Sequence, residues 1–80
     1  MTVRVEQDMI HLEGHCRVEE AETLLTALQE GGVRIVDIGQ VGRLHLALVQ
    51  ILIAWRPEIR GVPVDPFLRD WLLPLLRRSA

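Results

Sequence analysis

The chain contains no lysine, no asparagine and no tyrosine among its 80 residues, and its only serine is Ser79. The absence of lysine excludes a Schiff-base amine and the lysine that binds phosphates in a P-loop. Ser79 is the penultimate residue, where a fraying backbone is not expected to hold a nucleophile in register. The single cysteine, Cys16, cannot form a disulfide within the chain, which favours a reducing compartment. These absences argue against an enzyme and predict a cytoplasmic domain with no cofactor.

Charge and hydropathy exclude further classes of protein. Nine arginines and eleven acidic residues give a net charge of −2. Nucleic acid is therefore not an expected partner, because a phosphate backbone requires a concentrated positive field. The N-terminal residues lack the pattern of a signal peptide, and the longest apolar run, at 44–55, is too short for a bilayer core of ~30 Å. We expect one domain over residues 1–80, with no membrane insertion. Abundant arginine, leucine and valine without lysine also suggest a bacterial genome rich in GC.

Hydrophobic periodicity predicts the first elements. Alternating apolar and polar residues predict a β-hairpin of strands 3–6 and 9–12, with a turn at 7–8 and an end at Gly14. Apolar residues at three- and four-residue steps then predict a helix at 18–28. Its first turn is rich in glutamate, which complements the amide end of the helix dipole.

A second strand–helix unit is expected after the glycines at 31–32, which end the first helix. The nearly unbroken apolar run 33–38 predicts a strand covered on both faces and parallel to the strand before the helix. Residues 39–42 are expected to form a loop, and residues 43–55 a helix that Pro57 ends.

The last part of the chain predicts a short edge strand at 61–64 and a third helix. Asp65 and Pro66 are a good N-cap and first helical residue, and Pro74 should kink or break the helix. The expected fold is therefore α/β, a small mixed β-sheet of about four strands packed with three helices in the order ββαβαβα.

The predicted second helix is apolar on both sides. One stripe is broad enough to pack on a sheet, and it contains Leu44, Ala47, Leu48, Ile51, Leu52 and Trp55. The opposite side, which is polar in an ordinary surface helix, carries Leu46, Val49 and Ile53.

Two interpretations of that side stay open: the third helix covers it, or it meets another protein chain. The third helix offers a candidate second interface, because Phe67, Trp71 and Leu75 share one of its faces. Two such apolar helices in so short a chain favour a protein partner.

Residues 36–52, VDIGQVGRLHLALVQIL, resemble the signature of STAS domains, the fold of anti-sigma factor antagonists. In that family a buried strand ends in Asp-Leu-Ser, and an apolar residue, Asp-Ser and a helix rich in glycine and leucine follow. Upstream, Leu12-Glu13-Gly14 and the first helix resemble the family's Leu-x-Gly strand end and its first helix. The resemblance extends over about residues 3–54.

This chain departs from the family at the positions that matter for regulation. Gly39 stands in place of the loop serine, and His45 replaces the usual aspartate at the helix start. Leu46 replaces the serine that kinases phosphorylate, so a phosphate switch is absent. The resemblance therefore implies a STAS-like module that binds its partner constitutively, like the family members in bacterial transport assemblies and regulatory complexes. Its partner surface would be the second helix and the loop before it.

These observations lead to the hypothesis of a non-catalytic STAS-like subunit that binds another protein. The expected partner-binding residues are Gly39, Arg43, His45, Leu46, Val49, Gln50 and Ile53. The alternative is a self-associating protein, since two-fold homodimers are the commonest assemblies. A small-ligand or lipid module would need a pocket.

The other candidate sites give little support for metal binding or catalysis. His11, His15 and Cys16 lie close in sequence, but zinc needs three or four ligands in defined geometry, so no metal is expected. His15 and Cys16 are adjacent, and on an extended segment their side chains point to opposite faces, which argues against a thiol–imidazole pair. Asp37 at a strand end is expected to brace a loop or cap a helix.

Overall fold

A mixed β-sheet forms one layer of the protein, whose computed structural model describes residues 2–30 and 35–77. The strands follow the order β1 (Val3–Glu6), β2 (Met9–Cys16), β3 (Ile35–Leu44) and β4 (Glu58–Arg60). β1 is antiparallel to β2, whereas the β2–β3 and β3–β4 pairs are parallel.

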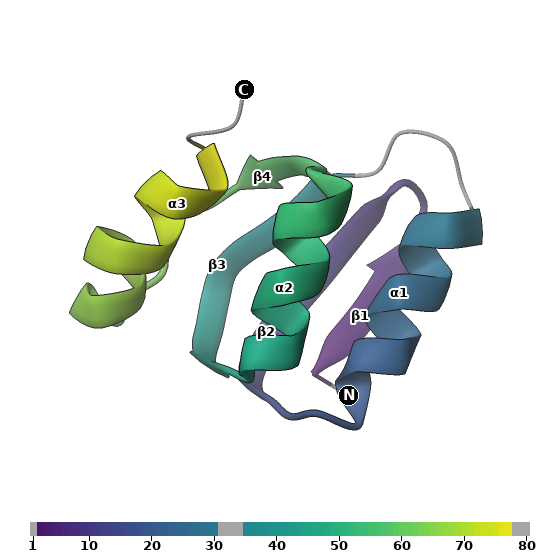
Figure 1. The fold of residues 1–80 in the computed structure, drawn as a ribbon, viewed down its shortest axis with the longest axis horizontal. Helices are drawn as coiled ribbons and strands as arrows, with labels where there is room; N and C mark the ends of the chain where they lie inside the picture. The colour runs from purple at the N-terminus through teal and green to yellow at the C-terminus, as the bar shows by residue number, and fades with distance from the viewer. Residues whose placement is uncertain (1, 31–34, 78–80) are drawn as a thin grey trace.

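Helices cover one face of this sheet. α1 (Glu20–Glu30) and α2 (Leu46–Trp55) pack against each other in front of the strands, and the C-terminal helical segment lies to their left in Figure 1. That segment consists of a π-helical turn, η1 (Leu68–Leu72), followed by α3 (Leu73–Arg77). The predicted α/β fold with a small mixed sheet and three helices is confirmed for the described ranges.

The hairpin and the first helix agree with the periodicity. β1 and β2 pair in register from Val3↔Leu12 to Glu6↔Met9, and Gln7 takes the positive φ of 57° that the tight turn requires. β2 continues past the predicted end at Gly14 to Cys16, and its register against β3 shifts between Gly14 and His15. The glycines at 31–32, predicted to end the first helix, lie outside the described residues.

β3 is longer than predicted, and the loop expected at 39–42 is wrong. Those residues continue the strand to Leu44, with Val41 buried as the next inward residue after Ile38. Gly42 lies against the backbone of Gly14 in β2, where a Cβ would be 3.5 Å from the Gly14 carbonyl oxygen. Gly39 and Gly42, which suggest a turn, are therefore both residues of the strand. As a result α2 begins at Leu46 and not at residue 43.

β3 is also not covered on both faces, as its apolar run predicted. Val36 and Ile38 are fully buried, but Asp37 and Gly39 between and after them are partly exposed. Alternate residues of a strand point to opposite faces, so one face of β3 packs under the helices and the other is accessible to solvent.

The fourth strand lies at 58–60, before the predicted position at 61–64. It pairs with the first half of β3, with Val36 opposite Ile59 and Asp37 opposite Arg60. Pro63 has no N–H to donate to a ladder, and its ring is buried instead. The predicted strand is wrong because the apolar pairing of Ile59 with Val36, rather than local β propensity, decides where β4 forms.

The C-terminal segment begins as predicted. Asp65 Oδ1 accepts a hydrogen bond of 2.8 Å from the Phe67 N–H, the bond of an aspartate N-cap followed by proline. The expected disturbance before Pro74 takes the form of the π-helical turn, in which the Leu73 N–H donates to the Leu68 carbonyl.

The buried side chains form one hydrophobic cluster between the sheet and the helices. The strands contribute Val3, Ile10, Leu12, Cys16, Val36, Ile38 and Val41. The helical segments contribute Leu24, Ala27, Leu28, Leu48, Val49, Leu52, Leu68, Leu72 and Leu73. α2 contributes its inner residues to this cluster, and its outer face is left to solvent.

Candidate partner-binding surface

The outer face of α2 is the most unusual surface of the protein. Leu46, Gln50 and Ile53 follow one another at i, i+4 and i+7 and are all exposed, with Leu46 at 60% and Ile53 at 42%. Beneath them, Leu48 and Leu52 are fully buried against the sheet. None of the ten residues of α2 is charged, although one side of the helix faces water. A surface helix normally places charged residues there.

Val49 does not belong to this face, and the expectation that it is exposed is wrong. Its exposure is 4%, and it lies in the same cluster as Leu68, Leu72 and Leu73. On a helical wheel Val49 is about 40° from Ile53 and about 60° from Leu52, at the border between the outer and inner faces. Val49 is therefore part of the core cluster, whereas Leu46 and Ile53 stay exposed.

The N-terminal end of α2 is well defined. His45 is the N-cap: its backbone is extended, and its Nδ1 accepts a hydrogen bond of 3.0 Å from the Ala47 N–H. The His45 N–H donates to the Cys16 carbonyl at 2.9 Å, which ties the start of α2 to the end of β2. The imidazole therefore takes the capping role that aspartate commonly has at this position.

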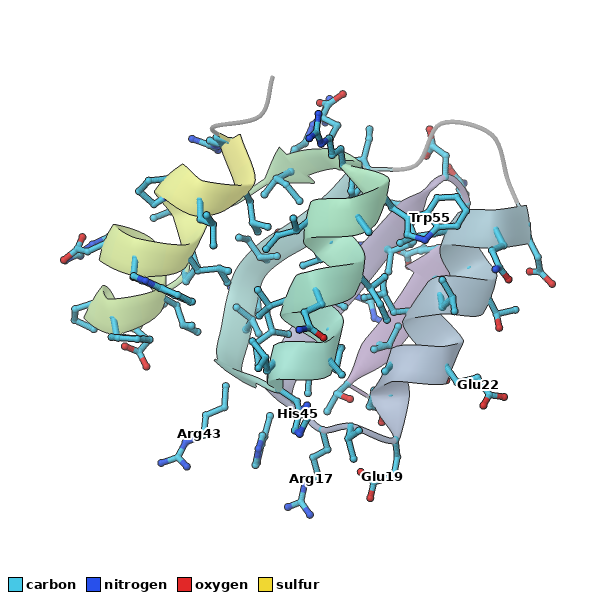
Figure 2. All side chains as sticks on the ribbon, in the orientation of Figure 1. Arg17, Glu19, Glu22, Arg43, His45 and Trp55 are labelled. Atoms are coloured by element: carbon cyan, nitrogen blue, oxygen red, sulfur yellow. The ribbon has the colours of Figure 1, made fainter. Side chains whose placement is uncertain are left out.

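Two arginines lie near this cap at the ends of the parallel strands. Arg43 and Arg17 extend into solvent below the sheet together with His45 (Figure 2). Among the described residues neither guanidinium has an ion-pair partner. The opposite end of α2 differs, because the indole of Trp55 extends from it toward α1 (Figure 2). The outer face of α2 thus has a cationic end and an apolar remainder.

Gly39 lies elsewhere, and its expected place in a loop beside α2 is wrong. It is in β3 on the face that points away from the helices, two residues after Asp37. Its N–H donates a 2.8 Å hydrogen bond to Asp37 Oδ1, so Asp37 braces the backbone of its own strand. The structure therefore brings together Arg43, His45, Leu46, Gln50 and Ile53 from the predicted set, and it separates Val49 and Gly39 from them.

The candidate second interface is partly exposed. The rings of Phe67 and Trp71 stack with their centroids 5.4 Å apart and 21° between their planes, and both are exposed. Leu75 is half-buried. The π-helical turn at Leu68–Leu72 interrupts the regular helical spacing on which the shared face of Phe67, Trp71 and Leu75 was predicted.

The open face of the sheet carries an ionic network that sequence reasoning missed. Arg4, His11, Asp37 and Arg60 stand opposite one another across the four strands. His11 lies between two carboxylates, with Nε2 3.3 Å from Glu6 and Nδ1 3.3 Å from Asp37. The sequence signal for this network is the polar residues that alternate with apolar ones along the strands. Their proximity can be recognised only when the register of the strands is known.

Arg4 organises the outer part of this network. Its guanidinium contacts Glu6 at 3.1 Å and Glu13 at 3.0 Å. The hydrogen bond from Arg4 lowers the pKa of the Glu13 carboxyl below its usual value. Both groups are exposed, so the network contributes mainly to solubility and strand register rather than to a low-dielectric site.

Cys16 is part of the core. Its Sγ is buried near the carbonyl oxygens of Glu13 and Thr2, and burial raises the pKa of the thiol. A buried thiol that stays protonated is a poor nucleophile. Over residues 2–30 and 35–77 no group of three or more histidine, cysteine or acidic side chains is arranged to hold a metal ion.

Comparisons with protein-family models, with curated proteins and with solved structures each find no match. Within the described ranges, no helix has both the length and the apolar character needed to cross a membrane.

The N-cap at His45 gives a direct test of this end of the surface. We expect His45→Ala to lower the free energy of unfolding by about 1 kcal/mol, because the Ala47 N–H loses its acceptor. His45→Asp should retain or exceed the original stability, since a carboxylate caps the same N–H and complements the helix dipole. Urea denaturation measures both. Equal destabilisation by the two substitutions would contradict the capping role.

Proposed function

We propose that this chain is a non-catalytic interaction module that binds another protein through the outer face of α2 and the residues that precede it. The observation that carries the proposal is a helix without charge whose Leu46 and Ile53 remain exposed after the chain has folded. Burying apolar side chains against a partner removes them from water at about 25 cal/mol per Å². Arg43 and His45 at the start of α2 would frame that contact with polar groups.

The proposal includes the STAS-like character of the module, with constitutive binding. Its support is the resemblance of residues 36–52 to the STAS signature and the presence of Leu46, which cannot accept a phosphate, at the regulatory position. Cys16, the single cysteine of the chain, is buried and cannot form a disulfide within it, which supports a cytoplasmic location. A small subunit of a bacterial transport or regulatory assembly fits the same description.

Self-association is the second candidate, and one geometric feature favours it. Leu46 and Ile53 are about 10 Å apart along the helix, with Gln50 between them. Two copies of α2 packed antiparallel about a two-fold axis would place Leu46 of each protomer against Ile53 of the other. A homodimer interface is self-complementary in this way.

Light scattering over a wide concentration range, followed by affinity capture from native lysate, tests both candidates. Ile53→Asp places a charge on the apolar part of the surface and should abolish assembly with either partner, because it would bury an unpaired carboxylate. Val64→Asp is the matched control, since Val64 is 79% exposed and lies outside α2. A dimer that only Ile53→Asp dissociates supports self-association. A monomer whose captured partner is lost only with Ile53→Asp supports a different protein. The same assembly state and the same captured proteins for the unsubstituted chain, Ile53→Asp and Val64→Asp would contradict the proposal.

A further inference from the structure

Four basic residues meet where the parallel strands β2 and β3 end. The register of the two strands pairs His15 with Arg43. The 2.9 Å hydrogen bond from the His45 N–H to the Cys16 carbonyl extends the parallel ladder by one step. This step places Arg17 beside His45. The topology therefore gathers at one end of the sheet two arginines and two histidines that come from two separate parts of the chain.

The side chains of these four residues point away from the core. Cys16 is buried, so its two neighbours in the chain face the opposite way. Leu44 packs against the core between the other two residues of the set, which face outward for the same reason. All four residues are exposed, and Arg17, Arg43 and His45 extend together below the sheet in Figure 2.

The guanidinium groups of Arg17 and Arg43 are close enough to share one ligand. Neighbouring strands are about 4.8 Å apart, and residues two apart on a strand are about 6.6 Å apart. The Cα atoms of the two arginines are therefore separated by about 8 Å. An extended arginine side chain covers most of that distance, so both guanidinium groups can contact a group that lies between them.

Arg17, Arg43 and His45 offer hydrogen-bond donors to a ligand. A guanidinium group has donors only. Nδ1 of His45 accepts the bond from the Ala47 N–H, so the proton of the neutral imidazole lies on Nε2, which is then a donor. Among the described residues neither arginine has an ion-pair partner, and Glu19, just before α1, makes no ion pair with Arg17. These donors are therefore available to an anion from outside the chain.

A phosphate monoester suits these donors better than a carboxylate does. A phosphorylated side chain carries a charge of about −1.5 to −2 at pH 7 and has three strong acceptor oxygens. A carboxylate has a single charge and two oxygens. The two guanidinium groups and the imidazole N–H can each bond a separate oxygen of a phosphate. Leu46 follows His45 directly and is 60% exposed, so an apolar side chain beside the phosphate would contact it.

We propose that the ends of β2 and β3 bind a phosphoserine or phosphothreonine that a partner protein presents next to an apolar residue. Arg17 and Arg43 would bind the phosphate oxygens, as arginine clusters do in phosphopeptide recognition. The His45 Nε2–H would donate to a third oxygen, and Leu46 would contact the apolar neighbour. Because the same partner would cover α2, this assignment rests on the function proposed above, and it specifies the group that the partner carries at this end of the surface.

A short phosphopeptide tests this site on the intact chain. The probe has a central phosphoserine followed by leucine, with alanine elsewhere. Titrated into ¹⁵N-labelled protein, it should shift the amide signals of Arg17, Arg43 and His45, and its affinity should fall as the NaCl concentration rises. The same peptide with an unmodified serine should cause no such shifts. Equal binding of the serine peptide, or phosphopeptide shifts located elsewhere, would overturn the proposal.

Two further probes test the nature and the source of the anion. A peptide with glutamate in place of phosphoserine should bind more weakly, because it has fewer charges and fewer acceptor oxygens. Inorganic phosphate should also bind more weakly than the phosphopeptide, because it lacks the leucine that contacts Leu46. Equal affinity of the glutamate peptide would overturn the choice of phosphate. Equal affinity of inorganic phosphate would overturn the role of a partner protein.

Substitutions of the exposed basic residues test the assignment without loss of the fold. Arg17→Gln and Arg43→Gln should each weaken phosphopeptide binding roughly three- to tenfold. Arg77→Gln is the matched control, because it removes the same charge from an exposed position in α3, away from the ends of β2 and β3 (Figure 1). His45→Asp retains an N-cap but places a carboxylate beside the phosphate, so it should abolish binding without loss of stability. Unchanged affinity after replacement of both Arg17 and Arg43 would contradict the proposal.

Ile53→Asp distinguishes the phosphate site from the α2 surface. It should leave binding of the short phosphopeptide unchanged, because Ile53 lies two turns along α2 from His45. Capture of a partner that depends on Ile53 but not on Arg17 and Arg43 would overturn the phosphate site and leave the function proposed for α2 intact. Phosphopeptide binding by a chain whose captured partner does not depend on Ile53 would contradict the α2 surface and support the phosphate site.

Discussion

Leu48→Ala should lower the free energy of unfolding by about 3 kcal/mol and the Tm by roughly 15 °C. Leu48 is fully buried beneath α2, in the cluster that joins α2 to the sheet and to the C-terminal helical segment. Removal of its isobutyl group loses transfer free energy and leaves a cavity that rigid neighbours fill only in part. For a domain of this size such a loss is a large part of the total stability. Urea and thermal denaturation followed by circular dichroism measure the effect.

Leu46→Ala is the matched control for Leu48→Ala. The two leucines are two residues apart in α2, but Leu46 is 60% exposed. Its truncation should change the unfolding free energy by less than about 0.5 kcal/mol while it weakens partner binding. Similar losses for both variants would mean that α2 is rotated about its axis relative to this structure, and the proposed surface would then be wrong.

Local sequence signals were sufficient for the parts of the fold that form from near neighbours. The hairpin follows from alternation at 3–6 and the apolar residues at 9–12, and α1 follows from apolar residues at helical spacing. The N-cap at Asp65 followed by proline is equally local. Each of these features depends on residues within about one turn or one hairpin, so a single sequence contains the necessary information.

The second half of the sheet was not predictable in the same way. Gly39 and Gly42 are typical of a loop, yet both lie in β3, where Gly39 accepts the close approach of the Gly61 backbone. β4 contains one apolar residue, Ile59, between charged ones, and its strand conformation depends on pairing with β3. Such long-range pairing outweighs the local propensity of the β-branched residues at 61–64.

The candidate surface was predictable as a helix face but not residue by residue. Periodicity correctly placed Leu46 and Ile53 opposite the core, because that relation depends on α2 alone. Val49 lies at the border of that face, and its burial depends on packing in the core cluster, which periodicity does not describe. The pair of His11 and Asp37 depends on the register of two strands that a whole helix separates.

The close contact of Gly61 with Asp37 and Gly39 predicts the second large effect on stability. Gly61→Ala should cost about 3 kcal/mol or more, because two penalties add there. The φ of Gly61 is +87°, a backbone conformation that disfavours any residue with a Cβ by about 1 kcal/mol. A Cβ at Gly61 would also lie 2.6 Å from Asp37 Oδ1 and 2.6 Å from the Gly39 nitrogen. Gly39 belongs to β3, whose backbone cannot move without loss of strand pairing.

Gly14→Ala separates the two penalties. Gly14 also has a positive φ, +65°, but no atom lies within 4 Å of a Cβ built on it. It should therefore cost only the conformational penalty of about 1 kcal/mol. Denaturation curves give the difference, and hydrogen exchange locates it: in Gly61→Ala, protection should be lost first between β4 and the Ile35–Asp37 part of β3. Equal costs at Gly61 and Gly14 would contradict the close packing of β4 against Asp37 and Gly39. The same packing holds the hydrogen bond from the Gly39 N–H to Asp37 Oδ1, which orients Asp37 toward His11.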